Sequence, residues 1–300
     1  MHGVITKGVG GLYTVRNEDG INVSCRIRGG LRHKKLTPFV GDKVEIGDSG
    51  DPDVPFVLEK ICPRKNNLVR PPLANIDLVL LAFAVSDPEP DLKLLDKMLI
   101  VCNVLSIEPV IIFTKADLDP DHAMKLHLIY SSCGYKCFIS SHDYRVGDEV
   151  TSLIGKDQIA AFAGPSGVGK STLCNHFLDD DNMEVGSISE RLKRGKHTTR
   201  HVELFELGEG FITDTPGFTS LDLFELGIDF DRVIGGYPEL IEASTYCRFK
   251  DCKHLGERDC HVKDLIEKGD PSIDKDRYLR YKEFYENLYQ RRNDYSVKRL

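Results

Sequence analysis

The sequence lacks any hydrophobic run long enough to cross a membrane. Its longest apolar stretch covers residues 78–85, whereas a transmembrane helix needs about 18 or more consecutive apolar residues. The N-terminus also lacks the charged and then apolar pattern of a secretory signal. These two absences argue against a membrane protein and against an exported one. We therefore expect the chain to stay in the cytoplasm and to have no membrane partner.

The sequence does not indicate disulfide bonds either. The nine cysteines are an odd number, and a chain without an export signal is expected to remain in a reducing compartment. We therefore expect free thiols and metal ligands instead of disulfides. The 300 residues, 41% of them hydrophobic and 29% charged, are typical of a globular protein with two or three domains.

Charge is distributed unevenly along the chain. The formal net charge is -7, yet residues 1–66 carry 11 lysines and arginines against 8 acidic residues, and residues 277–300 carry 7 against 3. Both ends are therefore basic while the middle is acidic. This pattern is typical of a protein whose ends hold a nucleic acid.

A phosphate-binding loop is the strongest motif in the sequence. Residues 164–172 fit the pattern GxxxxGK[ST], between an apolar run that predicts a strand and residues 171–178, which predict a helix. The glycines let backbone N–H groups turn toward phosphate oxygens, Lys170 adds a positive charge, and the Ser171 hydroxyl is suited to hold Mg²⁺. The predicted nucleotide contacts are Gly164, Pro165, Ser166, Gly167, Val168, Gly169, Lys170, Ser171 and Thr172.

The N-terminal segment predicts a small five-stranded barrel. Between residues 3 and 59, short β-rich runs such as 11–15 and 22–27 alternate with turn signals. Basic residues gather within one stretch that contains no acid, namely Arg26, Arg28, Arg32, His33, Lys34 and Lys35. In an OB-type barrel they would give one face a charge for a nucleic-acid backbone, and the alternative is an ordinary solvated hairpin.

The middle of the chain predicts a parallel sheet made of alternating strands and helices. We expect strands at residues 78–84, 109–113 and 135–139, and helices at residues 92–104 and 122–133.

A base-recognition motif follows the second of these strands. Thr114, Lys115, Ala116 and Asp117 resemble the [NT]KxD motif of GTPases, in which the carboxylate accepts hydrogen bonds from two N–H groups of guanine. In that motif the lysine stem covers the base, and adenine offers no such donor pair. Ser140 and Ser141 follow the third strand, where GTPases place a serine-containing loop against the base.

A polar segment after the phosphate loop is expected to be mobile. It ends in Thr198 and Thr199, either of which could offer its hydroxyl to Mg²⁺ as the switch I threonine does. The sequence does not distinguish them, and we assign the catalytic and magnesium-binding role to Thr198.

A second phosphate-sensing motif follows two further strands expected at residues 201–207 and 210–213. Asp214, Thr215, Pro216 and Gly217 form the DxxG pattern, whose aspartate reaches the Mg²⁺ shell and whose glycine N–H reaches the γ-phosphate.

The order of these motifs indicates a circular permutation. Ordinary GTPases place the phosphate loop first and the base-recognition motif last, whereas here Asp117 precedes Gly164. Because domain termini often lie close together, the chain can be joined there and opened elsewhere with the core intact. The permutation moves DxxG to the C-terminal end of the domain, next to whatever follows.

Four metal-binding side chains then lie close together in the sequence. Cys247, Cys252, His254 and Cys260 provide three thiols and one imidazole, a set that closes a tetrahedral zinc site. Because four protein ligands leave no open position, we expect one structural zinc ion and not a catalytic one. The alternative is a set of reduced core thiols, which is also our interpretation of Cys62, Cys102, Cys133, Cys137 and Cys174.

The C-terminal residues predict an amphipathic helix. Tyr278, Tyr281, Tyr285 and Leu288 recur at helical spacing, followed by the basic residues Arg291, Arg292, Lys298 and Arg299. The tyrosines could stack RNA bases, but a stripe that packs on a neighbouring element is the favoured interpretation.

Taken together, the basic barrel, the permuted TKAD, GPSGVGKST and DTPG motifs and the CxxxxCxHxxxxxC cluster resemble the RsgA (YjeQ) family over essentially the whole chain. These are bacterial GTPases of small ribosomal subunit maturation. The resemblance implies a multidomain protein: an OB-fold RNA-binding domain at residues 1–66, an α/β P-loop GTPase domain at 67–225 and a mainly α zinc-binding domain at 226–300. It also implies GTP, GDP and rRNA of the small subunit as partners, with magnesium bound beside GTP; we expect a monomer.

Other functions share some of these features. A P-loop ATPase or small-molecule kinase would not need TKAD, and a non-enzymatic RNA-binding module would not need Lys170, Ser171 and Asp214 together. A permuted GTPase of the large subunit is disfavoured by the barrel and the zinc cluster. The main alternative is a P-loop NTPase that binds RNA away from the ribosome.

One catalytic element is missing. Many GTPases carry, directly after DxxG, a glutamine that orients the attacking water, and here the position holds Phe218. An apolar ring cannot accept a hydrogen bond from water. We therefore expect slow hydrolysis that the small subunit accelerates. His197, beside Thr198, is a candidate for the missing group, and an exposed loop histidine is the alternative.

Overall fold

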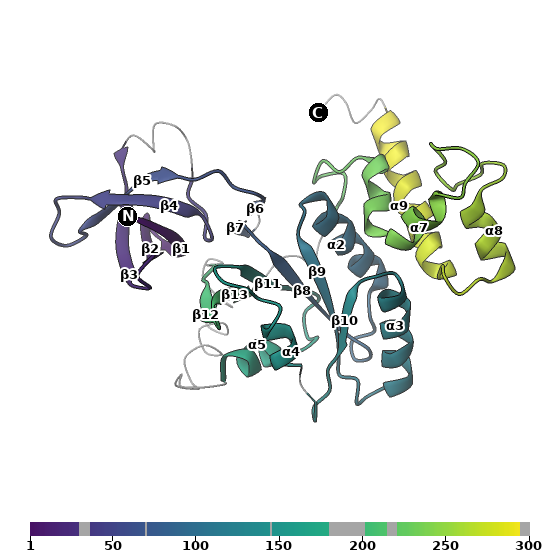
Figure 1. Ribbon diagram of the computed structural model, residues 1–300, viewed down its shortest axis with the longest axis horizontal. Helices are drawn as coiled ribbons and strands as arrows, with labels where there is room; N and C mark the ends of the chain where they lie inside the picture. The colour runs from purple at the N-terminus through teal and green to yellow at the C-terminus, as the bar shows by residue number, and fades with distance from the viewer. Residues whose placement is uncertain (30–36, 70, 145, 180–201, 215–220, 295–300) are drawn as a thin grey trace. The chain divides into compact units, whose positions relative to one another are not determined.

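The computed structural model describes residues 1–29, 37–69, 71–144, 146–179, 202–214 and 221–294 (Figure 1). Two compact units are found. The first contains Met1–Leu80, Arg145–Ala163 and Gly169–Gly217, and the second contains Leu81–Tyr144, Gly164–Val168 and Phe218–Leu300. Among the described residues, none of the helices combines the length and hydrophobicity that a membrane crossing requires.

The first unit begins with a closed five-stranded barrel, as predicted. Its strands are β1 (His2–Val9), β2 (Leu12–Asn17), β3 (Asn22–Ile27), β4 (Lys43–Asp48) and β5 (Phe56–Ile61), in the order β1-β2-β3-β5-β4 around the barrel. Only β3 and β5 pair in parallel. Inward side chains from all five strands are fully buried, namely Ile5, Val15, Cys25, Val44 and Leu58. Along β4, the buried Val44 and Ile46 alternate with more exposed neighbours, which is the period of two of a half-buried strand.

The segment after the barrel forms a hairpin. β6 (Asn67–Val69) pairs antiparallel with β7 (Pro72–Ala74). Two buried asparagines fix it. The side chain of Asn66 exchanges two hydrogen bonds of 2.9 Å with the backbone of Ile76, and that of Asn75 donates to the carbonyl of Gly41 at 2.9 Å.

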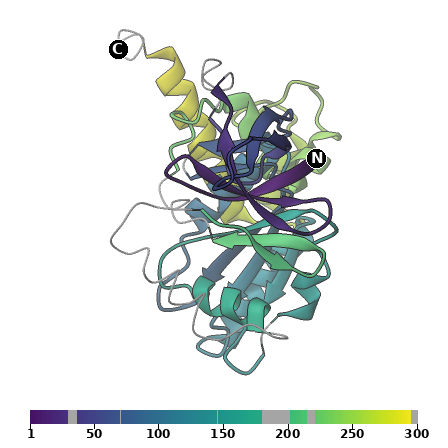
Figure 2. The ribbon, with the colours of Figure 1, turned by 90° about the vertical axis from the view of Figure 1, so that its left-hand side faces the viewer.

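A six-stranded sheet follows, in the order β10-β9-β8-β11-β13-β12. Its strands are β8 (Leu78–Ala84), β9 (Glu108–Thr114), β10 (Lys136–Ile139), β11 (Ile159–Ala163), β12 (Phe205–Leu207) and β13 (Gly210–Asp214). β9 pairs in parallel with β10, and β11 with β13, while β12 forms an antiparallel edge (Figure 2). The strand expected at residues 201–207 is observed only at Phe205–Leu207. Before it, Glu203 makes an isolated bridge to Lys7.

The sheet is accompanied by α2 (Leu92–Val104), α3 (Pro120–Ser132), α4 (Asp148–Thr151) and α5 (Lys170–Asp179). Aspartates begin the two long helices. Asp91 accepts a hydrogen bond from the N–H of Leu94 at 2.9 Å, and Asp119 accepts one from His122 at 3.0 Å. Because Asp119 caps the helix and Pro120 suits its first turn, α3 begins two residues before the predicted start.

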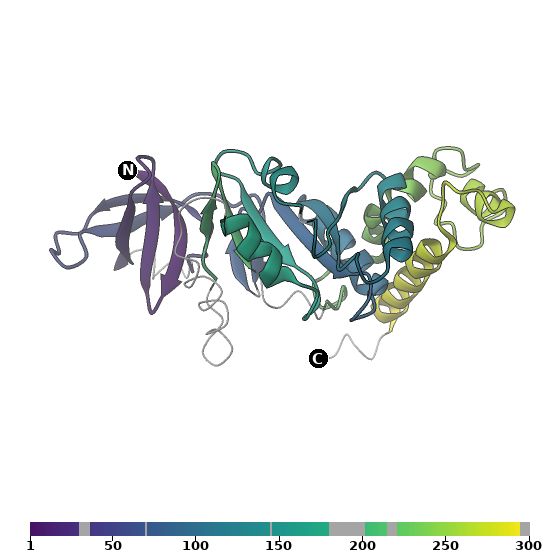
Figure 3. The ribbon, with the colours of Figure 1, turned by 90° about the horizontal axis from the view of Figure 1, so that it is seen from below.

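The C-terminal part of the second unit is helical, as predicted. It contains the 3-10 helix η1 (Phe230–Gly236), α7 (Pro238–Ser244), α8 (His261–Lys268) and α9 (Lys275–Asn293) (Figure 3). The predicted apolar stripe of α9 is buried, with Tyr278, Tyr281, Tyr285 and Leu288 each less than 9% exposed. This stripe packs against η1 and α2, so the favoured interpretation of a stripe that packs on a neighbouring element is confirmed.

Candidate nucleotide and metal sites

The phosphate loop lies between β11 and α5. Gly164, Gly167 and Gly169 have positive φ angles of 136°, 83° and 92°, which favour glycine. At Gly164 a Cβ would lie 2.1 Å from the carbonyl oxygen of Ala82, so any side chain would collide with β8 backbone. The loop is thus a tight turn into the N-terminus of α5, the geometry that offers backbone N–H groups to phosphate. The side chain of Ser171 lies outside the described part, so its contact with Mg²⁺ stays a prediction.

The base-recognition motif is attached directly to the phosphate loop. The Thr114 hydroxyl, at the end of β9, donates a hydrogen bond of 2.6 Å to the carbonyl of Val168, and both groups are buried. Lys115 has a φ angle of 56°, a backbone conformation that costs a non-glycine residue about 1–3 kcal/mol and is concentrated at functional sites. Its ammonium donates to the carbonyl of Asp87, in the loop after β8. Two motifs separated by some fifty residues in sequence thus form one site.

Asp117 is exposed and keeps capacity to accept hydrogen bonds. Its Oδ1 atom accepts one from the N–H of His142 at 3.0 Å. A carboxylate can accept about four hydrogen bonds, so one to His142 leaves room for the two N–H groups of guanine. The bond also fixes the direction of the carboxylate, because His142 belongs to the loop that begins at Ser140.

The serine loop is held by hydrogen bonds on both sides. Ser140 donates its N–H to the carbonyl of Phe113 at 2.8 Å and accepts the N–H of Ala116 at 3.1 Å with its own carbonyl. The Ser141 hydroxyl accepts the N–H of Tyr144 at 3.0 Å. Ala116, Ser140 and Ser141 therefore lie together, as the motif required. The roles of Asp87 and His142 were missed, because a backbone carbonyl and a backbone N–H leave no signal in the sequence.

Several predicted site residues lie outside the described part of the structure. These are the catalytic and switch positions His197, Thr198, Thr199, Gly217 and Phe218, together with the basic residues Arg32, His33, Lys34, Lys35, Lys298 and Arg299. For Asp214 the structure describes the backbone, which pairs with Phe162 at the end of β13, but not the side chain. Their predicted roles remain predictions.

The four predicted zinc ligands come together in the second unit. The ligand atoms of Cys247, Cys252, His254 and Cys260 all lie within 4.8 Å of one another. The His254 Nδ1 atom faces two thiols, 3.7 Å from Cys247 Sγ and 3.4 Å from Cys260 Sγ. Burial lowers the pKa of His254, which favours the neutral imidazole that a metal needs. Three thiols and one imidazole at this spacing fit a closed tetrahedral ion.

The loop that carries His254 is fixed by a carboxylate. Burial raises the pKa of Glu257, but hydrogen bonds from the backbone N–H groups of Lys253, Gly256 and Leu255 outweigh burial and lower this pKa to about 2. These bonds are 2.7 to 3.0 Å long. Two tyrosines of α9 reach the same loop, since Tyr278 donates to the carbonyl of His254 at 2.7 Å and Tyr281 to that of Lys253 at 2.9 Å. The metal cluster is thus tied to α9.

Arg277 directly precedes Tyr278 on α9, and no motif in the sequence marked it as important. Its side chain is fully buried and donates to Glu239 at 2.8 Å, to Asp96 at 2.5 Å and to the carbonyl of Gly236 at 3.0 Å. The guanidinium also lies 4.7 Å from the ring centres of both Tyr130 and Tyr237. These partners belong to α2, α3, η1 and α7. The C-terminal helices are therefore joined to those that flank the base-recognition strand.

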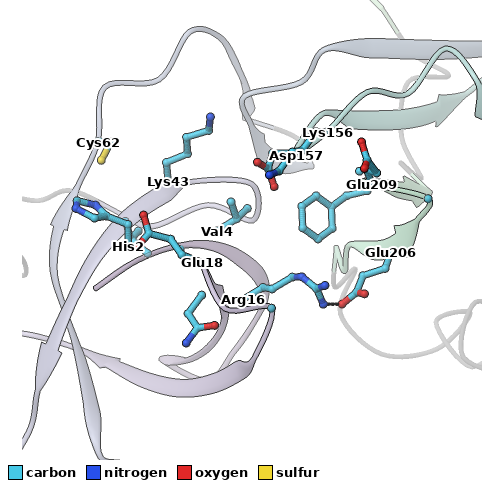
Figure 4. Close-up of a pocket in the computed structure, with 17 residues that line it drawn as sticks. His2, Val4, Arg16, Glu18, Lys43, Cys62, Lys156, Asp157, Glu206 and Glu209 are labelled. Atoms are coloured by element: carbon cyan, nitrogen blue, oxygen red, sulfur yellow. Dashed lines mark ion pairs between the residues drawn. The ribbon is translucent and has the colours of Figure 1, made fainter.

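The basic residues of the barrel are partly neutralised. Arg26 forms an ion pair with Asp51 at 3.0 Å, and Arg28 forms one with Glu59. A cavity of about 640 Å³ in the first unit also has charges of both signs in its lining, among them the ion pair of Arg16 with Glu206 (Figure 4). It contains none of the predicted nucleotide-binding residues. The other four basic residues of the predicted face lie outside the described part, so its role in binding a nucleic-acid backbone stays a prediction.

Comparisons with known proteins agree with the fold and the motifs. The RsgA GTPase family matches residues 61–224, and the RsgA N-terminal domain family matches residues 2–52. The small ribosomal subunit biogenesis GTPase RsgA of Clostridium novyi is 42% identical over 97% of this chain and 98% of its own length. The protein of that name from Bacillus cereus (strain ATCC 14579) is 39% identical over 98% of this chain and 99% of its own.

Two solved structures are similar over nearly the whole chain. YloQ, described as a circularly permuted GTPase, has a TM-score of 0.80 and 33% identity, covering 98% of this chain and 96% of its own. YjeQ from Thermotoga maritima has a TM-score of 0.78 and 29% identity, covering 96% of this chain and 98% of its own. The predicted permutation of the central domain is therefore confirmed.

Proposed function

The chain belongs to the RsgA family of GTPases, and from this membership we propose that it hydrolyses GTP to GDP and phosphate while assisting late maturation of the small ribosomal subunit. The observation that carries the proposal is the bond between Thr114 and Val168. It joins a guanine-recognition motif to a phosphate loop, which an ATPase would not need. The names of the relatives supply the ribosomal partner.

In the proposed GTP site, guanine lies against Asp117, which accepts its two N–H groups. The stem of Lys115 covers the ring, and the loop of Ala116, Ser140 and Ser141 borders it. The backbone of residues 164–172 surrounds the phosphates, with Lys170 balancing their charge. Magnesium, held by Ser171 and Thr198 with Asp214 behind it, would supply charge neutralisation at the β- and γ-phosphates.

The proposed hydrolytic step depends on groups around the γ-phosphate. Lys170 stabilises negative charge there, and the N–H of Gly217 senses the phosphate. Because Phe218 cannot orient water, we assign that task to His197 once the subunit is bound. This assignment explains why hydrolysis should need the ribosomal partner.

The Cys₃His cluster is proposed to hold one structural zinc ion. Its four donors fit the ion and leave no open position for a substrate. Residues 1–66 would then be the RNA-binding barrel, 67–225 the GTPase domain and 226–300 the zinc-binding domain. We further propose that the protein works as a monomer in the cytoplasm, in contact with rRNA of the small subunit.

Sedimentation with separated ribosomal subunits tests this function. Wild-type protein with a non-hydrolysable GTP analogue should sediment with small subunits and not with large ones, and GDP should release it. ATP should not compete with the analogue. Binding to large subunits only, or to no subunit while free RNA is bound, would instead support the alternatives of a large-subunit GTPase or a non-ribosomal RNA-binding NTPase.

A further inference from the structure

A small pocket lies beside the metal cluster, in the second unit. Its volume is about 170 Å³, and aromatic rings form much of its wall, namely Phe230, Phe249, Tyr281 and Tyr285. This volume is below the roughly 300 Å³ of sites for drug-sized ligands, so the pocket admits a single ring system and not a whole nucleotide. The nucleotide motifs of the GTP site contribute nothing to its lining.

The aromatic wall is rigid on one side and open on the other. Phe230 and Tyr285 meet edge to face with ring centres 5.2 Å apart, and the Tyr281 hydroxyl is held by the carbonyl of Lys253. Tyr285 is 7% exposed, whereas Phe249 is 44% exposed. The pocket therefore has packed, buried rings on one side and one accessible ring, Phe249, on which a planar ligand can stack.

The ring of Phe249 is exposed, and its backbone is held beside the metal cluster. It lies between the metal ligands Cys247 and Cys252, and its carbonyl accepts the N–H of Cys252 at 3.3 Å. The guanidinium of Arg248 lies 5.6 Å from its ring centre. An exposed aromatic ring beside cationic side chains is a suitable platform for nucleic-acid bases, because every base has a face that can stack.

The polar rim of the pocket carries a hydrogen-bond acceptor next to a donor. The carboxylate of Asp231 and the ammonium of Lys253 are 2.9 Å apart, with side chains 53% and 42% exposed. An ion pair this exposed contributes little to stability, so a ligand can replace it at small cost. Among the bases, guanine fits this pair best: two adjacent N–H donors for the carboxylate and one carbonyl acceptor for the ammonium.

We propose that this pocket binds one unpaired guanine of RNA, stacked on Phe249 and read at its edge by Asp231 and Lys253. The inference rests on the proposed function, because the RNA is that of the small subunit. It adds a second guanine-binding site to the chain, one that reads RNA and not GTP. Lys250 lines the pocket and is exposed, so it is available for a flanking phosphate, whereas Arg248 is paired with Asp259 at 2.6 Å.

The test uses the zinc-loaded, full-length protein with an excess of a non-hydrolysable GTP analogue, so that the GTP site is filled and the protein is in the state expected to bind the subunit. The probe is a labelled RNA hairpin whose uridine loop carries one guanosine, compared with the same hairpin carrying adenosine there. Wild-type protein should prefer the guanosine hairpin. Phe249→Ala should weaken its binding by about 5- to 150-fold, the range expected for the loss of one base stack.

Two further variants separate recognition from folding. Asp231→Asn should remove the preference for guanosine while binding of the adenosine hairpin is retained. Leu279→Ala, at a 48% exposed position of α9 outside the pocket, is the matched control and should bind like wild type. Zinc content and far-ultraviolet circular dichroism verify that each variant is folded.

The inference is overturned if Phe249→Ala binds the guanosine hairpin as wild type does, or if wild type shows no preference between hairpins. A photocrosslink from position 249 to a ribosomal protein, with none to RNA, would also overturn it. Its failure is distinguishable from failure of the proposed function. Protein that sediments with small subunits but fails the hairpin test contradicts only the pocket, whereas loss of sedimentation contradicts the ribosomal role itself.

Discussion

Replacing Arg277 should loosen the C-terminal helices far more than replacing any surface arginine. The Arg277→Ala change removes hydrogen bonds to Asp96, Glu239 and the carbonyl of Gly236, all at a site with no solvent exposure. After the change, Asp96 still pairs with Arg280 at 2.5 Å. Glu239, in contrast, pairs with no cation other than Arg277 among the described ion pairs. Breaking a buried ion pair in this way costs about 3–5 kcal/mol.

The matched control lies on the same helix. Arg291 pairs with Asp222 at 2.7 Å, but the side chains are 36% and 38% exposed, so Arg291→Ala should cost less than about 1 kcal/mol. Hydrogen exchange of α9, read by mass spectrometry, measures both variants under native conditions. A loss of 3–5 kcal/mol corresponds to exchange about 150- to 5,000-fold faster in Arg277→Ala.

A second change tests the electrostatic reason. In Arg277→Ala, the carboxylate of Glu239 is left buried without its cation, so adding Glu239→Gln should restore part of the protection by removing that charge. Equal losses for Arg277→Ala and Arg291→Ala, or a double variant less protected than Arg277→Ala alone, would refute the account of this cluster.

Three further predictions concern the sites. Asp117→Asn should weaken GTP binding and improve binding of xanthosine triphosphate, because xanthine presents an acceptor where guanine presents its amine; equal GTP affinity in both proteins would exclude Asp117 from the site. Gly164→Ala should abolish GTP binding, since its Cβ would lie 2.1 Å from the Ala82 carbonyl oxygen, and calorimetry with GDP measures this; unchanged affinity would show that the loop can shift freely. Chelating zinc should speed hydrogen exchange in residues 247–260 and, because Tyr278 and Tyr281 bond that loop, at the start of α9. Exchange in β1 to β5 should not change. The absence of zinc from protein purified without a chelator would contradict this prediction.

Local patterns predicted most of the fold. The strand at residues 78–84 and the helix at 92–104 have the predicted bounds. The strand is a continuous apolar run, and the helix begins directly after the capping residue Asp91, so both signals lie in adjacent residues. The motifs of the GTP site were also readable, since each is a short run with its own backbone conformation. Their contact through Thr114 and Val168 was not predicted, although loops at one edge of a parallel sheet often meet.

Contacts between distant residues could not be predicted in this way. Arg277 and Asp96 are 181 positions apart, and an arginine on a basic helix gives no sign that it will be buried. The bond from Lys115 to the carbonyl of Asp87 depends on a backbone atom, which every residue has. Arg26 and Arg28 are a similar case: their charge was visible in the sequence, but their pairing with Asp51 and Glu59 was not.

Single-turnover GTP hydrolysis, with and without purified small ribosomal subunits, tests the central claim most directly. Phe218 follows DxxG where many GTPases have a water-orienting glutamine, so the protein alone should bind GTP but hydrolyse it slowly. A partner that supplies or orders the missing group accelerates such enzymes by roughly 10³ to 10⁵. We predict a large acceleration by small subunits, reduced in His197→Ala without loss of GTP binding. Fast hydrolysis by the protein alone, unchanged when small subunits are added, would contradict the account.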